Sequence, residues 1–388
     1  MLIYRRNALM AGKRLPYDAE VEYLESTGTQ WIDTGITFSD SSHTYKWEIT
    51  AQSVNESSGN YKWFCGYFTG YPHCCGTYND TIETSRAFYP TGKYYANGVE
   101  ISSPINATDK KYDVVENIYS VNGLGTSDTL TIFTRRDTRY GTVSVSGPLR
   151  VYACKLYDNA NLVRDFIPVR VGTVGYLYDR VSGKLFGNAG TGDFTCGPDV
   201  VPVEYIESHG TEYIDTGIKS APTTKAVVDT AFTSGSVLGV VIPSNYSMLF
   251  CFTSGTASTV RYYYGSTSNY DYTIDKTMRH VYGISKDFEI DGSVVYTSSN
   301  TLTTGMQNIY AFGRLNNGNP NDLLKGKIFS LKIYDGDTPA RKFLPVRVGT
   351  GSTWEGAMMD VLTRKVYRNQ GTGAFTYGND LKYPIPAE

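Results

Sequence analysis

The chain repeats itself, and this repeat constrains its fold more than any other feature. Residues 21–36 read VEYLESTGTQWIDTGI, residues 203–218 read VEYIESHGTEYIDTGI, and 12 of these 16 positions are identical. The segments 155–172 (KLYDNANLVRDFIPVRVG) and 332–349 (KIYDGDTPARKFLPVRVG) also match. A period of about 180 residues indicates two whole domains rather than a solenoid of short repeats.

The repeat also sets the expected domain boundaries. We expect an N-terminal leader over 1–16, a first domain over 17–197 and a second domain over 203–380. Residues 198–202 (PDVVP) are expected to be a short linker that its prolines stiffen, and residues 381–388 a C-terminal tail.

Short runs of β-favouring residues between turn residues predict an all-β fold. The 388 residues include 33 Tyr, which suits half-buried strands, and 39 Gly, which suits tight turns. Asn97-Gly98 and Asp291-Gly292 each separate two such runs, which predicts hairpin turns with positive φ. No helical spacing of apolar residues persists beyond a turn or two. Other strands are expected over 44–51, 130–134, 150–157, 225–232, 279–284, 309–313 and 327–334.

The alternation in 327–334 predicts sheets packed in a sandwich or barrel. We expect Phe329, Leu331 and Ile333 to face the core and Lys332 and Tyr334 to face solvent. One buried and one wet face is typical of antiparallel sheets in packed pairs.

Charge and hydropathy exclude several classes of protein. The net charge is −2 and the pI is about 6.1. The chain therefore lacks the basic excess that would indicate nucleic-acid binding. The sequence contains no apolar stretch of about 18 residues, the length expected of a membrane-spanning helix. The start, MLIYRRNALMAGKRL, lacks the apolar run of a secretory signal peptide.

The cysteines do not repeat between the copies, so no disulfide framework is expected. We expect reduced, mostly buried thiols. A metal cluster at His73-Cys74-Cys75 with Cys65 is disfavoured, because the spacing matches no common zinc site. The cysteines are Cys65, Cys74, Cys75, Cys154, Cys196 and Cys251.

Three motifs of the sequence show a family resemblance. The opening YLESTGTQWIDTG, the late KLYDNANLVRDFIPVRVG and the closing YDRVSGKLFGNAGTGDFTCG resemble the laminin G-like, concanavalin A-like domains of tailed bacteriophages and their gut bacterial hosts. The resemblance extends from about Tyr17 to about Asp380. It implies two tandem jelly-roll β-sandwiches, carried on a virion or cell surface, that bind glycans or proteins.

No pattern in the sequence indicates a catalytic centre, so we expect a protein that is not an enzyme. A glycoside hydrolase needs two carboxylates across a cleft. The nearest match to E-x-D-x-x-E is Glu289-Ile290-Asp291, but position 294 is Val and Asp291-Gly292 predicts a turn. The four histidines do not recur between the copies, and they are His43, His73, His209 and His280.

Charged residues that recur in both copies are expected to serve the shared fold. We expect the aspartates to cap turns through their side-chain oxygens, with a Ca²⁺ site as the alternative. We expect the arginines to form an ion pair or to bond a backbone carbonyl. No other metal or cofactor is expected. These residues are Asp33, Asp158, Asp215, Asp335, Arg170 and Arg347.

Aromatic clusters differ between the copies and offer a candidate glycan platform. Exposed aromatic rings can stack on the C–H faces of sugars. The alternative is that alternate members face the core and the rest cover the sheet. The candidate ligand-binding residues are Trp63, Tyr67, Tyr71, Tyr262, Tyr264, Tyr270 and Tyr272.

These observations leave several functions open. The first is a non-catalytic phage virion protein, on the tail or a capsid appendage, that contacts host-surface or mucosal glycans. The second is a purely structural virion component, docked to other virion proteins through Arg5, Arg6, Lys13 and Arg14 of the leader. A glycan hydrolase and a bacterial surface adhesin are further alternatives. A virion protein would assemble in the bacterial cytoplasm and act outside the cell. It could also form a homo-oligomer.

Overall fold

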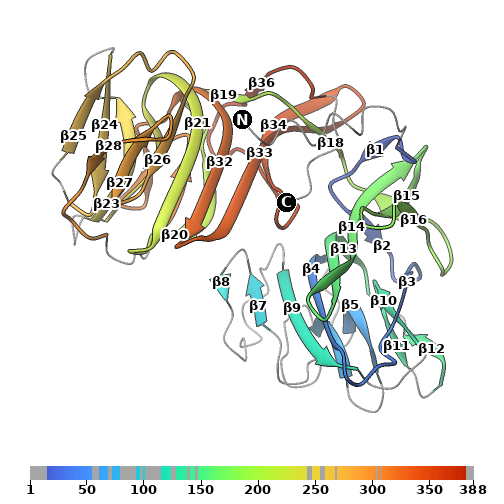
Figure 1. Ribbon diagram of the computed structural model, residues 1–388. Coiled ribbons are helices and arrows are strands. Elements are labelled where there is room, and N and C mark those ends of the chain that lie inside the picture. The colour runs from blue at the N-terminus through green and yellow to red at the C-terminus, as the bar shows by residue number, and fades with distance from the viewer. Residues whose placement is uncertain are drawn as a thin grey trace. The chain divides into compact units, whose positions relative to one another are not determined.

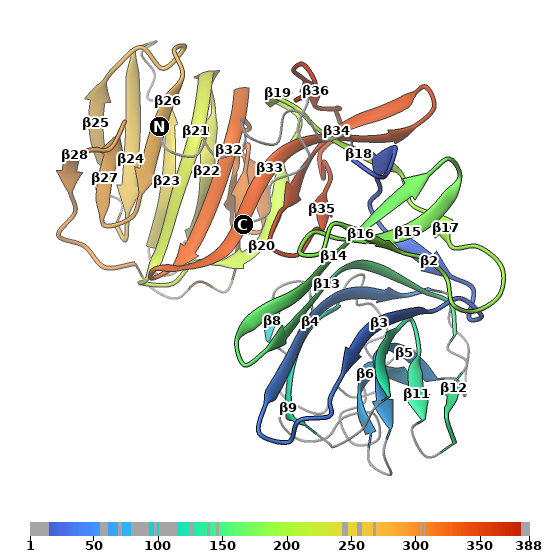
Figure 2. The same ribbon diagram turned by 45° about the vertical axis from the view of Figure 1, so that its right-hand side comes forward.

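The chain is an all-β protein, as the sequence predicts. The computed structural model describes residues 15–54, 61–68, 72–78, 93–96, 99–100, 115–123, 128–137, 140–144, 147–242, 247–253, 258–266, 269–302, 305 and 307–381. The chain divides into two compact units, and the main boundary between them falls between Gly197 and Pro198 (Figures 1 and 2). No helix in the described part has the length and apolarity of a bilayer span.

The first domain contains a large sheet built around β13 and β4, which pair antiparallel. Three short strands flank this path, because β1 pairs with β14, β2 pairs with β13, and β17 pairs with β2. In spatial order the sheet contains β16 (Lys184–Phe186), β15 (Val174–Asp179), β14 (Asn161–Val171), β13 (Leu149–Asp158), β4 (Thr44–Ser53), β9 (Val115–Asn122), β7 (Lys93–Ala96) and β8 (Val99–Glu100), flanked by β1 (Ala19–Glu20), β2 (Leu24–Ser26) and β17 (Thr195–Cys196).

A smaller sheet completes the first domain. The buried side chains Trp47 and Ile49 of the large sheet and Phe64 and Leu130 of the smaller sheet contribute to its core. The smaller sheet contains, in order, β12 (Thr142–Ser144), β11 (Arg135–Asp137), β5 (Tyr61–Phe68), β10 (Thr129–Ile132) and β3 (Ile32–Thr37), with β6 (Pro72–Tyr78) on β5.

The second domain repeats the large sheet, with the order β21-β32-β33-β34 corresponding to β4-β13-β14-β15. Here β18 pairs with β33, and β19 pairs with β32 and β36. The strands, in order, are β28 (Ser293–Thr297), β27 (Asp287–Ile290), β26 (His280–Ile284), β21 (Thr224–Ser234), β32 (Lys325–Asp335), β33 (Thr338–Thr350), β34 (Thr353–Asp360) and β35 (Val366–Tyr367), flanked by β18 (Asp199–Pro202), β19 (Ile206–His209) and β36 (Thr376–Tyr377).

Its smaller sheet supplies the other half of the core. Val228 and Leu331 of the large sheet pack in one cluster with Leu238 and Tyr262 of the smaller sheet, so the two sheets form a sandwich. The smaller sheet contains, in order, β20 (Ile214–Lys219), β29 (Asn308–Ala311), β22 (Ser236–Ile242), β23 (Ser247–Thr253), β24 (Thr259–Tyr264) and β25 (Asn269–Thr273), with β30 (Arg314–Asn316) on β22 and β31 (Asn319–Asn321) on β30.

The prediction of two tandem β-sandwiches is confirmed, and so is the second hairpin. Each strand predicted by range overlaps an observed strand, although β10 ends at Ile132 and β29 at Ala311, two residues short of the ends predicted. Asp291 and Gly292 join β27 to β28 with φ of 51° and 80°, as a type I′ turn requires. The other predicted turn, Asn97-Gly98, lies outside the described residues.

The structure bears on the expected linker and on the expected terminal segments. The expected linker is wrong for residues 199–202, because they form β18 and pair with β33 of the second domain. Main-chain hydrogen bonds therefore hold this segment against the sheet. Most of the leader (1–14) and of the tail (382–388) lies outside the described residues.

The predicted orientation of one strand is also wrong at a single position. Ile328, Leu331 and Ile333 of β32 are buried, but Phe329 is partly exposed. The cause is a β-bulge, since Ile328 pairs with Thr230 and Ser330 pairs with Asp229, which leaves Phe329 without an opposite residue on β21.

A core substitution tests the sandwich. Phe288 is fully buried and its ring stacks 4.7 Å from that of Tyr262, across the two sheets. We expect Phe288→Ala to lower the free energy of unfolding of the second domain by about 3–5 kcal/mol in urea denaturation. The control Val294→Ala removes a side chain that is 56% exposed, and we expect about 0.5 kcal/mol or less. Equal losses in the two variants would contradict the buried interface.

Candidate functional site

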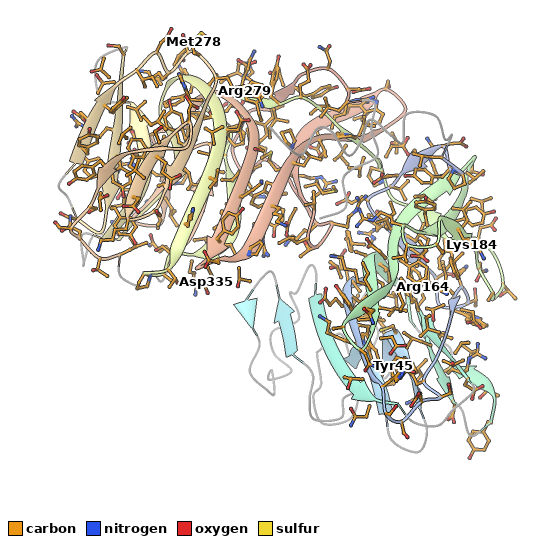
Figure 3. The ribbon with its side chains drawn as sticks, viewed as in Figure 1. Tyr45, Arg164, Lys184, Met278, Arg279 and Asp335 are labelled. Atoms are coloured by element: carbon orange, nitrogen blue, oxygen red, sulfur yellow. The ribbon has the colours of Figure 1, made fainter. Side chains whose placement is uncertain are left out.

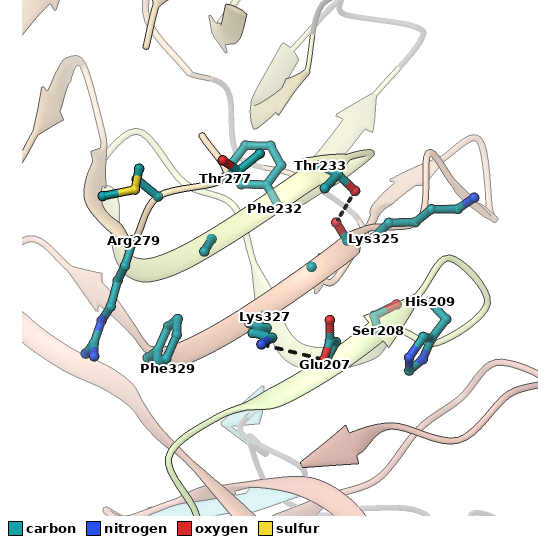
Figure 4. Close-up of a pocket in the computed structure, with 13 residues that line it drawn as sticks. Glu207, Ser208, His209, Phe232, Thr233, Thr277, Arg279, Lys325, Lys327 and Phe329 are labelled. Carbon is teal, nitrogen blue, oxygen red and sulfur yellow. Dashed lines mark hydrogen bonds and ion pairs between the residues drawn. The ribbon is translucent and has the colours of Figure 1, made fainter. Parts of the chain in front are cut away.

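A groove of about 520 Å³ lies on the large sheet of the second domain, and Figure 4 shows the residues that line it. The face of the sheet turned away from the core carries side chains of β19, β32 and β21. Its middle row is the cross-strand set Glu207, Lys327 and Ala231. On one side of this row lies the bulged Phe329, and on the other side Lys325 pairs with His209 of β19.

The bulge in β32 places an aromatic ring in this groove. A regular strand would turn Phe329 inward beside Leu331, whereas the extra residue lets it point outward. The guanidinium of Arg279 lies 4.0 Å from the centre of the Phe329 ring. Arg279 and Phe329 therefore form a cation–π stack at the groove's edge.

A bidentate ion pair holds the guanidinium in that stack. The Nε and Nη2 atoms of Arg279 donate to the two carboxylate oxygens of Asp229, at 2.8 Å and 2.6 Å. Bidentate geometry restricts the rotation of the guanidinium plane. The pair thus orients both Arg279 and the ring beneath it.

The middle row pairs a second cation with both an acid and a ring. Lys327 Nζ lies 3.9 Å from Glu207 Oε2 and 4.2 Å from the centre of the Tyr205 ring. The Tyr205 ring packs edge-to-face on Phe329, with 5.5 Å between centroids. Ala231, the last member of this row, lines the groove with only a methyl group.

A short loop before β26 forms the wall on the far side. Met278, 61% exposed, and Arg279 extend from this loop (Figure 3). The Thr277 hydroxyl and amide both donate to Asp275 Oδ1, at 2.5 Å and 3.1 Å, and these bonds lower the pKa of Asp275. The bonds close an Asx turn that positions the loop.

The first domain contains an equivalent cluster. Tyr152 is the bulged residue of β13, because Val151 pairs with Ala51 and Ala153 pairs with Thr50. Arg150 then lies 4.2 Å from the Tyr23 ring and 2.7 Å from Glu25, as Lys327 lies beside Tyr205 and Glu207. The repeat therefore extends to this surface, which the sequence comparison did not single out.

Most of the predicted aromatic platform is buried or lies outside the described side chains. Trp63, Tyr262 and Tyr264 are core residues, so this prediction is wrong for them. In β24 the inward positions are 260, 262 and 264, whereas Tyr263 lies on the other face and is partly exposed. Tyr270 and Tyr272 are partly buried against the core.

The remaining predicted residues cannot be placed. The side chain of Tyr67 and the whole of Tyr71 lie outside what the structure describes, as do the proposed anchoring residues Arg5, Arg6, Lys13 and Arg14. Their roles stay predictions.

The aspartates of the IDTG motif cap turns, as predicted. Asp33 Oδ1 accepts a hydrogen bond from the Gly35 amide at 2.9 Å, and Asp215 Oδ1 accepts one from Gly217 at 2.8 Å. By contrast, Asp158 lies 2.8 Å from the His43 ring. Asp335 accepts a hydrogen bond from a threonine hydroxyl. Among the described residues, no group of three metal-ligating side chains gathers.

The recurring arginines have the structural roles predicted for them. Arg347 donates through Nε and Nη2 to Asp380, at 2.6 Å and 2.8 Å. Arg170 donates to the Gly172 carbonyl at 3.0 Å.

The described cysteine side chains are free thiols, as the sequence predicts. Cys65 and Cys154 are buried, and Cys196 is partly exposed.

Of the carboxylates considered for hydrolysis, Asp291 holds a turn instead. Asp291 Oδ1 accepts the Val281 amide at 2.9 Å, and Oδ2 lies 2.7 Å from His280 Nδ1. Burial acts to raise the pKa of Asp291, but the bonds from Val281 and His280 outweigh it and lower the pKa overall. Asp291 therefore stays ionised and locks the β27–β28 turn onto β26.

Comparison with known proteins does not show a family for this chain. No family model matches the chain, and no curated protein matches it. The mouse laminin α1 chain, domains LG4-5, is similar at 11% identity and a TM-score of 0.24, over 83% of this chain and 90% of that one. A protein of Bacteroides ovatus ATCC 8483 described as a "putative carbohydrate binding protein" is similar at 9% identity and a TM-score of 0.33, over 92% and 100%. Neither similarity identifies a ligand for this chain.

The turn lock gives a pH-dependent prediction. Because the pKa of Asp291 is lower in the folded chain, its ionised form stabilises the fold above the ordinary carboxyl range, and this contribution is lost as pH falls through the folded-state pKa. We expect Asp291→Asn, which keeps the turn's positive φ accessible, to cost up to about 1 kcal/mol at neutral pH. In urea titrations, the difference in free energy of unfolding between wild type and this variant should shrink below about pH 4. A difference that persists or grows as pH falls below about 4 would contradict this assignment.

Proposed function

We propose that the chain is a non-catalytic carbohydrate-binding protein and that the groove of its second domain holds the glycan. The observation that carries this proposal is the outward Phe329 ring, flanked by oriented polar groups in a groove of about 520 Å³. A sugar presents C–H groups and hydroxyls side by side, so it needs apolar and polar surface in alternation.

The apolar surface comes from three side chains. Phe329, Met278 and Ala231 offer contact to the C–H groups of a sugar ring. Aromatic and methionine side chains can make this contact without losing hydrogen bonds to water.

The polar surface consists of pairs that are already oriented. Arg279 with Asp229 and Lys327 with Glu207 place donors and acceptors next to one another. A sugar hydroxyl both donates and accepts, so it matches such pairs. Because each of these two cations has an acidic partner, the groove favours a hydroxyl-rich ligand over a simple ion.

The carboxylates of the groove favour binding over hydrolysis. Glycoside hydrolases of the common type use two carboxyl groups on either side of the scissile bond. Among the described lining residues, Glu207 is the only acid, and the nearby Asp229 has both oxygens engaged by Arg279. We therefore propose recognition without chemistry.

The biological setting is proposed from the sequence motifs alone. Their resemblance to phage-encoded laminin G-like domains favours a virion protein, on the tail or a capsid appendage, that contacts host-surface or mucosal glycans and other virion proteins. We propose neither nucleic acid nor membrane as a partner. Ca²⁺ dependence stays open to test with a chelator during the binding assay below.

The proposal is tested with the full chain on an array of mucin-type and bacterial-surface glycans. We expect wild-type protein to bind a defined set, and Phe329→Ala to weaken binding at least about tenfold, which corresponds to 1.4 kcal/mol. Arg279→Ala should act in the same direction, because it removes the stack on the ring.

The control variant is Tyr140→Ala, which truncates a tyrosine of the first domain that is 71% exposed and does not line the groove. We expect it to bind like wild type. Absence of any glycan binding by the wild-type chain would overturn the proposal and favour the purely structural virion role. Undiminished binding by both groove variants would place the glycan elsewhere.

A further inference from the structure

One residue of the groove differs between the two copies in a way that bears on binding. Lys327 pairs with Ala231 across β32 and β21, and Arg150 pairs with Gln52 across β13 and β4. Lys327 and Arg150 each lie two residues before the bulged aromatic residue of their strand. Gln52 therefore occupies in the first copy the position that Ala231 occupies in the second.

In the first copy this position is filled by the protein itself. The Tyr152 hydroxyl donates to Gln52 Oε1 at 2.7 Å, so the two side chains satisfy one another. Tyr152 is only 5% exposed, and burial raises its pKa. The aromatic ring on the bulge is therefore covered.

In the second copy neither half of that contact exists. Ala231 lacks the carboxamide, and Phe329 lacks the hydroxyl. Phe329 is partly exposed, and the space above Ala231 belongs to the groove. The same strand geometry thus gives a covered surface in one copy and an open one in the other.

From these contacts we infer that position 52/231 determines which copy binds. Ala231 opens the site in the second domain, and Gln52, bonded to Tyr152, closes the equivalent surface in the first. This inference rests on the proposed function, and it adds that the tandem chain holds one glycan rather than two.

Isothermal titration of the full chain with a glycan that it retains on the array tests this directly. We expect one glycan per wild-type chain. Two equivalent glycans per chain would overturn the inference while leaving the proposed function intact. No binding at all would overturn the proposed function itself, and the two failures are therefore distinguishable.

A pair of substitutions tests the position itself. Ala231→Gln should weaken binding at least about tenfold, because the added carboxamide occupies the groove as Gln52 occupies the first copy. Ala231→Ser, which keeps the side chain small, should bind within about twofold of wild type. Melting temperatures close to that of wild type would show that both variants fold. Wild-type affinity in a folded Ala231→Gln variant would overturn the inference. If that variant does not fold, the wild-type stoichiometry still decides.

Discussion

The surface chemistry of this protein depends on a β-bulge in the central strand of each large sheet. One extra residue, Tyr152 in β13 and Phe329 in β32, interrupts the ladder with the neighbouring strand, β4 or β21. A bulge bends the strand and changes the direction of the side chain that it carries. In the second domain, Phe329 consequently points away from the core, although it belongs to an alternating apolar pattern. Without the bulge, Phe329 would lie among core residues and its ring would not line the groove.

The groups around the ring position it more than they stabilise the fold. Arg279 is exposed and Lys327 half-exposed, and exposed ion pairs contribute about 0–1 kcal/mol each. The fold is stabilised by side chains buried between the sheets, such as Val228, Leu331 and Phe288. Stability and recognition therefore depend on opposite faces of the same strands. For this reason, the two copies can keep one core pattern while their outer surfaces diverge, as Gln52 and Ala231 do.

The sequence predicts the framework because the framework follows from local rules. The duplicated motifs, the alternation of apolar residues and the Asp291-Gly292 turn are each visible within short segments, and they predict the strands and the repeat. The bulge is not visible in this way, since the alternation of 327–334 fits a regular strand equally well. The choice of Tyr262 and Tyr264 over Tyr263 failed for a related reason, because the sequence alone does not say which of two alternating faces is the inner one.

The site itself depends on pairing between distant segments. Asp229 and Arg279 are separated by 50 residues, and Glu207 meets Lys327 only because β19 lies beside β32. One sequence signal could have indicated the site: an aromatic residue follows a cation by two positions at Arg150/Tyr152 and again at Lys327/Phe329. Its meaning becomes clear only when the register across the sheet is known.

Hydrogen–deuterium exchange of the full chain, with and without a saturating glycan selected on the array, is the most direct measurement of where the ligand binds. Binding in the groove predicts slower exchange in peptides that cover β19, the end of β21, the loop before β26 and the start of β32, with β13 and β4 of the first domain unchanged. Protection confined to the first domain, or to the smaller sheet of the second, would contradict the account.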